Sequence, residues 1–143
     1  MARSTGIRLL LGVSLGMSLI AGSLALHGCG SGGGGGTSNL PAVTTINAKN
    51  DAAAPMGFSF DSPVTVSKGT AVQWSNISTA PHGIIWDAQS PASSPAPGAN
   101  IPNFGPGTTS ASWTAPNVTV ATAYNYHCSV HGPTMAGVIN VTP

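Results

Sequence analysis

Charged side chains are scarce in this chain. Four Lys and Arg and three Asp and Glu make up only 5% of its 143 residues, against about 25% in an ordinary soluble domain. The sequence therefore offers no basic patch for nucleic acid and no acidic patch that could steer a charged partner. Because carboxylates are so few, we also expect little of the folding stability to depend on their ionisation.

Residue sets that perform acid–base or nucleophilic catalysis are missing as well. We recognise no paired carboxylates and no nucleophile next to a base, which such enzymes use. We therefore expect a protein that is not an enzyme and has no small-molecule substrate. The only two cysteines are Cys29 and Cys128, which excludes a metal centre that needs two cysteines on one loop. Exported proteins normally pair their cysteines, but here we expect each to have its own chemical role.

The first 28 residues have the pattern of an export signal. Arg3 and Arg8 precede an apolar and small-residue stretch over residues 9–26, as in a signal peptide. The apolar part could just span a bilayer, so an uncleaved anchor is an alternative.

The residues that follow indicate a lipid anchor and a tether. The segment 26–29 resembles the cleavage box of bacterial lipoproteins, which implies cleavage before Cys29 and lipid on its sulfur; a free thiol is the alternative. Residues 29–39 contain five consecutive glycines and are expected to form a flexible linker. Residues 40–143 then form the folded domain.

This domain has the pattern of an all-β protein. No long segment has the helical period of apolar residues, and short runs rich in Val, Ile, Thr, Trp and Tyr alternate with turn residues. This pattern predicts a β-sandwich or barrel. The predicted strands are residues 43–48, 56–60, 63–67, 70–76, 83–87, 110–114, 123–128 and 137–142. Residues 88–109 are rich in Ser, Pro, Ala and Gly and are expected to form a long loop between the sheets, pinned by Ile101 and Phe104.

The run from Tyr124 to Ile139 is the most informative part of the sequence. It places a thiolate, an imidazole and a thioether, from Cys128, His131 and Met135, between two strand-like segments. Two histidines, one cysteine and a weak axial methionine form the blue-copper electron-transfer site. His82, which follows Pro81, is the candidate for the missing histidine.

These motifs resemble the cupredoxin family, in particular the plastocyanin- and pseudoazurin-like small blue copper proteins. The matching parts are residues 60–76, Pro81 with His82, 126–131 and 135–137. The resemblance implies a Greek-key β-sandwich of about eight strands that holds one type 1 copper ion. It also implies ligation by His82, Cys128 and His131 with a distant Met135, and passage of electrons through His131.

The chain departs from the family pattern at two places. Three residues separate His131 from Met135, where plastocyanin has four and amicyanin two. Gly83 stands where plastocyanins have an asparagine that ties this strand to the ligand loop, a kind of bond that orients ligands. Among the other candidates, Met56 is a weaker choice for the axial thioether. His127 should point to the opposite face from Cys128.

We therefore expect a membrane-tethered blue copper protein that carries single electrons outside the cytoplasmic membrane, as a periplasmic or cell-surface lipoprotein. We expect a monomer that meets redox partners through an apolar patch near His131, formed by Pro81, Gly83, Pro133 and Ala136. Two alternatives stay open. One is a copper storage or delivery lipoprotein without an electron-transfer role, and the other is a metal-free adhesion module.

Overall fold

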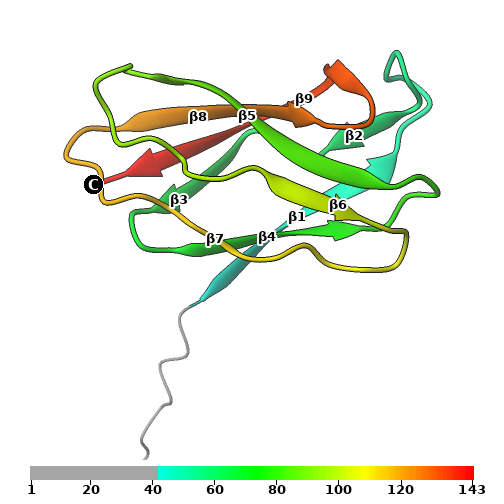
Figure 1. Cartoon of the computed structure of the whole chain (residues 1–143), viewed down its shortest axis with the longest axis horizontal. Helices are drawn as coiled ribbons and strands as arrows, with labels where there is room; N and C mark the ends of the chain where they lie inside the picture. Colours follow the sequence, from blue (N-terminus) through cyan, green and yellow to red (C-terminus); the bar gives the residue numbers. More distant parts are fainter. Residues whose placement is uncertain (1–41) are drawn as a thin grey trace, which may run out of the picture. The chain divides into compact units, whose positions relative to one another are not determined.

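The computed structural model describes residues 42–143, and every regular element in this part of the chain is a strand (Figure 1). The nine strands are β1 (Val43–Asn50), β2 (Phe58–Phe60), β3 (Val64–Ser67), β4 (Ala71–Asn76), β5 (His82–Ser90), β6 (Ile101–Phe104), β7 (Trp113–Thr114), β8 (Thr122–Cys128) and β9 (Gly132–Thr142). Among these residues there is no helix with the length and apolar character needed to cross a membrane.

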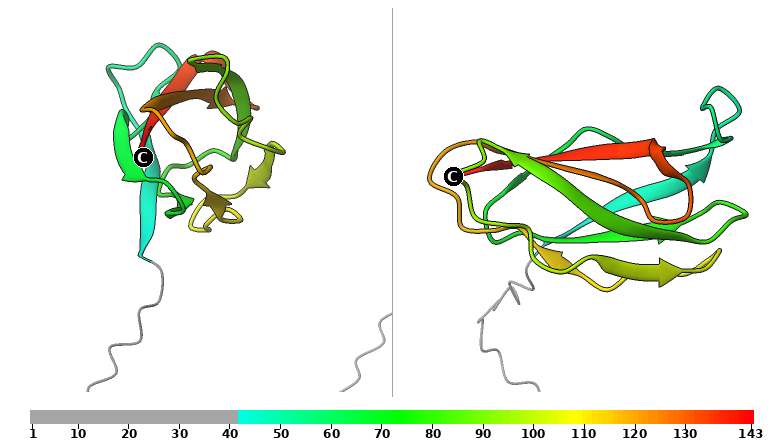
Figure 2. Two further views of the ribbon diagram at one scale, coloured as in Figure 1. Left: turned by 90° about the vertical axis from the view of Figure 1, so that its left-hand side faces the viewer. Right: turned by 45° about the horizontal axis from the view of Figure 1, so that its top comes forward.

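The strands form two sheets that face each other across one interior, as the end-on view in Figure 2 shows. One sheet has the order β2-β1-β4-β7 and the other has the order β3-β9-β8-β5-β6. β1 runs parallel to β4 and β3 runs parallel to β9, while the other neighbours are antiparallel. The predicted all-β sandwich is confirmed.

Every second side chain of two central strands, β4 and β8, is buried in the core. In β4 the buried residues are Val72, Trp74 and Asn76, and in β8 they are every second residue from Thr122 to Cys128. Successive side chains of a strand point to opposite faces. The register that buries Tyr124 and Tyr126 therefore also turns Cys128 into the interior.

Aromatic rings fill much of the space between the sheets. Trp74 meets Tyr126 edge-on with ring centroids 5.5 Å apart, and Trp86 lies 4.8 Å from Trp113. Phe60 continues this cluster toward the end of the sandwich where β8 ends, 5.2 Å from Tyr126. Burying a large apolar side chain contributes about 1.5–3 kcal/mol, so this cluster is a main source of the stability of the fold.

The structure corrects the predicted loop over residues 88–109. β5 continues to Ser90, and residues 101–104 form β6 at the edge of the five-stranded sheet. Ile101 and Phe104 are both buried, as expected. They are three residues apart because the pairing of β6 with β5 contains a bulge, and a bulge breaks the alternation by which strands are recognised.

A second correction concerns the start of the last strand, which is residue 132 rather than 137. Gly132 pairs with Cys128, whereas Ala136 pairs with His127. Residues 133–135 are thus extra on β9 and bulge out of the ladder. The predicted signal peptide, the lipidation site Cys29 and the linker 29–39 lie outside the described residues.

Several connections meet at one end of the sandwich, seen at the right of Figure 1. They are the connections from β1 to β2, from β4 to β5 and from β8 to β9. β5 begins at this end with His82, and β8 finishes there with Cys128. The fold therefore brings the ends of two hydrogen-bonded strands, and the turn between β8 and β9, to one place.

Candidate metal centre

Strand pairing explains why residues far apart in the sequence meet here. β5 and β8 are antiparallel neighbours, and Ile84 lies opposite Cys128. His82 is two residues from Ile84 at the start of β5, so its side chain and that of Ile84 share the inner face. His131 closes the group from the three-residue turn that follows Cys128.

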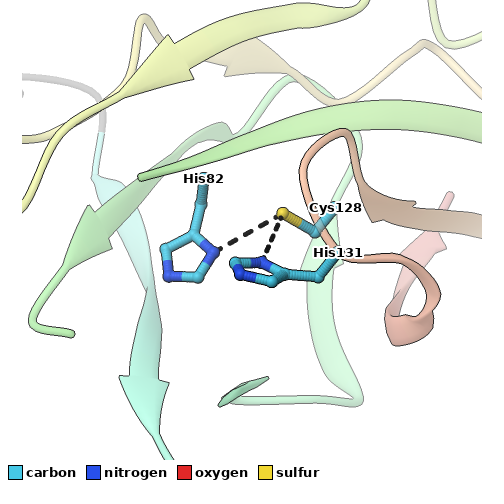
Figure 3. Close-up of side chains that lie close together, drawn as sticks. All are labelled: His82, Cys128 and His131. Carbon is cyan, nitrogen blue, oxygen red and sulfur yellow. Dashed lines mark hydrogen bonds between the residues drawn. The ribbon is translucent and has the colours of Figure 1, made fainter. Parts of the chain in front are cut away.

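The donor atoms of these three side chains face one another (Figure 3). Cys128 Sγ lies 3.5 Å from Nδ1 of His82 and 3.3 Å from Nδ1 of His131. All three donors lie within 4.8 Å of one another. With bonds of about 2.0 Å to nitrogen and about 2.3 Å to sulfur, as for zinc, a trigonal ion holds such atoms about 3.7 Å apart. The spacing therefore fits one ion of this size.

The donor set itself selects the type of metal. One thiolate with two imidazoles suits copper or zinc, and a weak axial thioether points to copper. Cys128 is a free cysteine and fully buried. Hard cations such as magnesium and calcium prefer oxygen ligands, and no carboxylate belongs to this group among the described residues. The chemistry therefore favours copper.

The turn that carries His131 has a glycine where its backbone needs one. Residues 129–131 join β8 to β9, and Gly132 has a φ of +62°. Gly132 is the first residue after the turn, and glycine adopts this left-handed conformation without strain. The turn thus folds back tightly enough to bring His131 next to Cys128.

The structure places the two candidate thioethers differently. Met135 follows two exposed residues in the bulge of β9 and is 1% exposed. Met56 is 49% exposed, which does not suit an axial ligand of a buried ion. The bulge turns Met135 into the interior, at the end of the sandwich where the three donors lie.

An aromatic side chain covers the histidines. Phe58 of β2 lies 4.7 Å from the ring of His131 and 5.5 Å from that of His82. His82 is fully buried, whereas His131 is partly exposed. The site is therefore closed on the His82 side and reaches the surface only beside His131.

A buried polar network holds the other nitrogen of His82. Ser78 Oγ lies 2.7 Å from His82 Nε2 and 2.8 Å from Asn76 Oδ1. When Nδ1 serves as the metal ligand, Nε2 carries the proton and donates it to Ser78, whose hydroxyl donates to Asn76. Such outer contacts fix the tautomer and orientation of a ligating imidazole.

The surroundings of His82 also suit metal binding electrostatically. Burial, and then the neighbouring His131, lower the pKa of His82 from 6.5 to about 4. A histidine ligand must be neutral to bind a metal. At neutral pH the imidazole of His82 is therefore ready to bind without first losing a proton.

Sequence reasoning did not identify Ser78 or Asn76. Ser78 lies in the connection before Pro81, where serine is an ordinary turn residue, and Asn76 is the last residue of β4, so no signal marked either of them. His127 was correctly placed on the opposite face, where its Nδ1 lies 2.9 Å from Asp87 Oδ1.

Comparison with known protein families agrees with this geometry. Residues 44–142 match the family described as copper-binding proteins of the plastocyanin/azurin family. This chain belongs to that family. The resemblance to cupredoxins is therefore confirmed, and copper is its cofactor, with His82, Cys128, His131 and Met135 positioned as a single site.

Solved structures with this fold are distant in sequence. A purple cupredoxin from Nitrosopumilus maritimus is 22% identical, with a TM-score of 0.52 over 69% of this chain and 99% of that chain. An oxidised amicyanin variant is 22% identical, with a TM-score of 0.49 over 68% and 80%. No curated protein sequence matches this cupredoxin significantly. At these identities the first structure supports the fold alone.

Proposed function

We propose that this cupredoxin is an electron carrier rather than an enzyme. In this proposal His82, Cys128 and His131 would hold one copper ion, and the buried thioether of Met135 would be a further, weaker ligand. The single observation that carries the proposal is the convergence of Cys128 Sγ on both Nδ1 atoms, at 3.3 and 3.5 Å. When bound, copper supplies a reversible one-electron change between Cu(I) and Cu(II).

The residues of the site favour electron transfer by keeping their positions in both oxidation states. His82 is held at Nε2 by Ser78, and Cys128 is fixed at the end of a paired strand. Both are 0% exposed, so they exclude water and leave no opening for a substrate. A copper storage or delivery site should be more open, because its ion must exchange.

Electrons would enter and leave through His131. It is the only partly exposed member of the group of three, and its neighbour Val130 is 45% exposed. Met56 and Ile77 are also exposed, and each lies within two residues of a side chain that contacts a site histidine, Phe58 or Ser78. These apolar residues suit docking of a redox partner.

One residue of the apolar patch expected near His131 does not belong to the surface. Gly83 is buried, whereas Pro81, Pro133 and Ala136 are exposed. We therefore propose a docking surface formed by Pro81, Pro133 and Ala136 together with the exposed Met56, Ile77 and Val130. We further propose that the carrier is a monomer, tethered by lipid on Cys29 and working outside the cytoplasmic membrane.

Electrochemistry of the copper-loaded protein tests the proposed function. We expect one reversible one-electron wave per chain, with optical changes that follow it. A colourless protein that holds only Cu(I), exchanges it readily and gives no reversible wave would instead indicate copper storage or delivery. Unchanged copper content in Cys128→Ser would contradict the ligand set.

A further inference from the structure

The residue after His82 lacks a side chain because other side chains occupy that space. Gly83 is buried, and a Cβ atom added there would collide with Asn103 Oδ1 and Ser129 Oγ. These two atoms are themselves joined, since the Ser129 hydroxyl donates a 2.6 Å hydrogen bond to Asn103. A bond between two other segments thus passes directly over the bare backbone of Gly83.

The two residues joined by this hydrogen bond, Ser129 and Asn103, differ in how close they lie in the sequence to the metal ligands. Ser129 directly follows Cys128 and begins the turn that carries His131. Asn103 belongs to β6, which lies at the edge of the five-stranded sheet. This strand contributes no donor atom to the group of His82, Cys128 and His131. The bond therefore connects the start of the ligand turn to the outer edge of the sheet.

A second bond ties the same residue to the strand of His82. The backbone N–H of Ser129 donates to the carbonyl oxygen of Gly83 at 3.1 Å. Ser129 is thus held at its backbone by β5 and at its side chain by β6. With both bonds made, the chain has little freedom to rotate between Cys128 and His131.

We propose that Asn103 is a positioning residue of the copper site, acting through Ser129. Gly83, Asn103 and Ser129 form what we call the β6 clasp. In the clasp the missing side chain of Gly83 leaves room for the side chains of Asn103 and Ser129. The hydrogen bond between these two side chains fixes the ligand turn. The role in copper binding rests on the proposed function, whereas the two hydrogen bonds of the clasp are seen directly in the structure.

The clasp should affect the site more than it affects global stability. Asn103 and Ser129 are both exposed, and a hydrogen bond in such a place contributes little to folding stability. Loss of a residue that orients a metal ligand, however, typically costs 10–100-fold in metal affinity. A merely structural contact would not show this imbalance.

The first test removes the bond from either side. We expect Asn103→Ala and Ser129→Ala each to speed copper loss to a chelator about tenfold, and the double variant to behave like either single one. In the copper-free protein, exchange of the residue 129 amide should also quicken in all three. Gln73→Ala is the matched control, because it removes an exposed bond from Gln73 to Thr45 and should change neither measurement.

The outcomes separate the clasp from the proposed function. Unchanged copper loss and amide exchange in Asn103→Ala, or additive effects in the double variant, would overturn the clasp. If the wild-type chain fails to bind copper, the proposed function fails, while the amide exchange of the copper-free chain still decides whether the clasp exists.

The second test fills the space. Gly83→Ala should clearly destabilise the copper-free wild type, because the methyl group meets both partners. The same substitution in the Asn103→Ala/Ser129→Ala background should be much better tolerated, with the carbonyl oxygen of Ile101 as the remaining close neighbour. Equal destabilisation in the two backgrounds, measured by denaturant unfolding, would contradict the proposal.

Discussion

His82 is held through both of its ring nitrogens, and this is the feature of a single residue on which the site most depends. Nδ1 faces Cys128 and Nε2 faces Ser78. Because the ring is fully buried, water cannot replace either partner. The orientation of the imidazole is therefore set before copper arrives.

Removal of the serine hydroxyl should weaken copper binding. In Ser78→Ala the proton on His82 Nε2 loses its acceptor in a buried position, which costs about 1–3 kcal/mol, and we expect copper affinity to fall at least about tenfold. Competition titration with a chelator measures this. Ser110→Ala is the control, because Ser110 bonds Trp74 and Ala111 instead of a histidine. Equal loss of affinity in both variants would contradict the role of Ser78.

The low pKa of His82 predicts acid sensitivity of the copper-free protein. The pKa is 6.5 in the unfolded chain and about 4 in the fold, so between these values the unfolded state binds more protons. Stability should therefore fall as the pH falls from 6.5 to 4, by at most about 3 kcal/mol. The scarcity of carboxylates does not prevent this loss of stability at low pH, because the group that takes up the proton is a histidine.

Denaturant unfolding at several pH values tests this expectation. His82→Asn should remove most of the dependence, while His127→Gln, which changes a histidine outside the group of three, should keep it. Stability that is flat between pH 6.5 and 4 in the copper-free wild type would show that His82 is not held neutral by the fold.

The candidate ligands could be proposed from sequence, but the residues that orient them could not. Few side chains suit copper, so Cys128, His131 and Met135 on one short run already restrict the chemistry. Serine and asparagine occur in most loops. Ser78 gains its role from the local turn that brings it to His82, and Asn103 gains its role from the packing of β6 beside β5, which brings it to Ser129.

At the scale of elements, the alternating strands were predictable and the bulged ones were not. β4 and β8 alternate strictly between buried and less buried residues, and both were predicted within one residue. β6 contains Pro102 and has its two buried residues at positions 101 and 104. Its edge position tolerates the proline, but the segment has no period-two pattern from which a strand could be recognised.

The turn between β8 and β9 should depend on the conformation of one glycine. Gly132→Ala forces alanine to a φ of +62° with no atom within 4 Å of its Cβ, so the cost is backbone strain of about 1–2 kcal/mol. We expect this variant to change the visible and electron-paramagnetic spectra of bound copper as well, because the turn positions His131.

Gly69→Ala provides the matched control for this substitution. Gly69 has a φ of +77° and equally open space, but it lies in the turn before β4, away from the donors. We expect a similar loss of stability and unchanged copper spectra. Identical spectra for Gly132→Ala and wild type would show that the turn tolerates rearrangement without moving His131.

On the scale of the whole molecule, the scarcity of charged residues should make docking to redox partners depend on apolar contacts. Residues 42–143 contain two lysines and three aspartates, a net charge of −1, and Lys49 is paired with Asp61. Interactions between exposed charges are screened by salt, whereas apolar contacts are not weakened in this way. Electron exchange should therefore depend little on ionic strength.

Two surface variants measure this docking mode. Val130→Lys places a charge beside His131 and should slow electron self-exchange clearly and make it salt-dependent. Val120→Lys is the matched control, since Val120 is 52% exposed but precedes the far end of β8. A wild-type rate that falls tenfold or more from low to high salt would contradict apolar docking.

The central claim is that His82, Cys128 and His131 form one preassembled site for a single copper ion. The visible and electron-paramagnetic spectra of the Cu(II)-loaded protein test it most directly, because they report ligands and geometry together. We predict one copper per chain, an intense thiolate-to-copper charge-transfer band and the narrow hyperfine splitting of a type 1 centre, all lost in Cys128→Ser. A weakly coloured protein with the spectrum of ordinary tetragonal Cu(II), unchanged by that substitution, would contradict the claim.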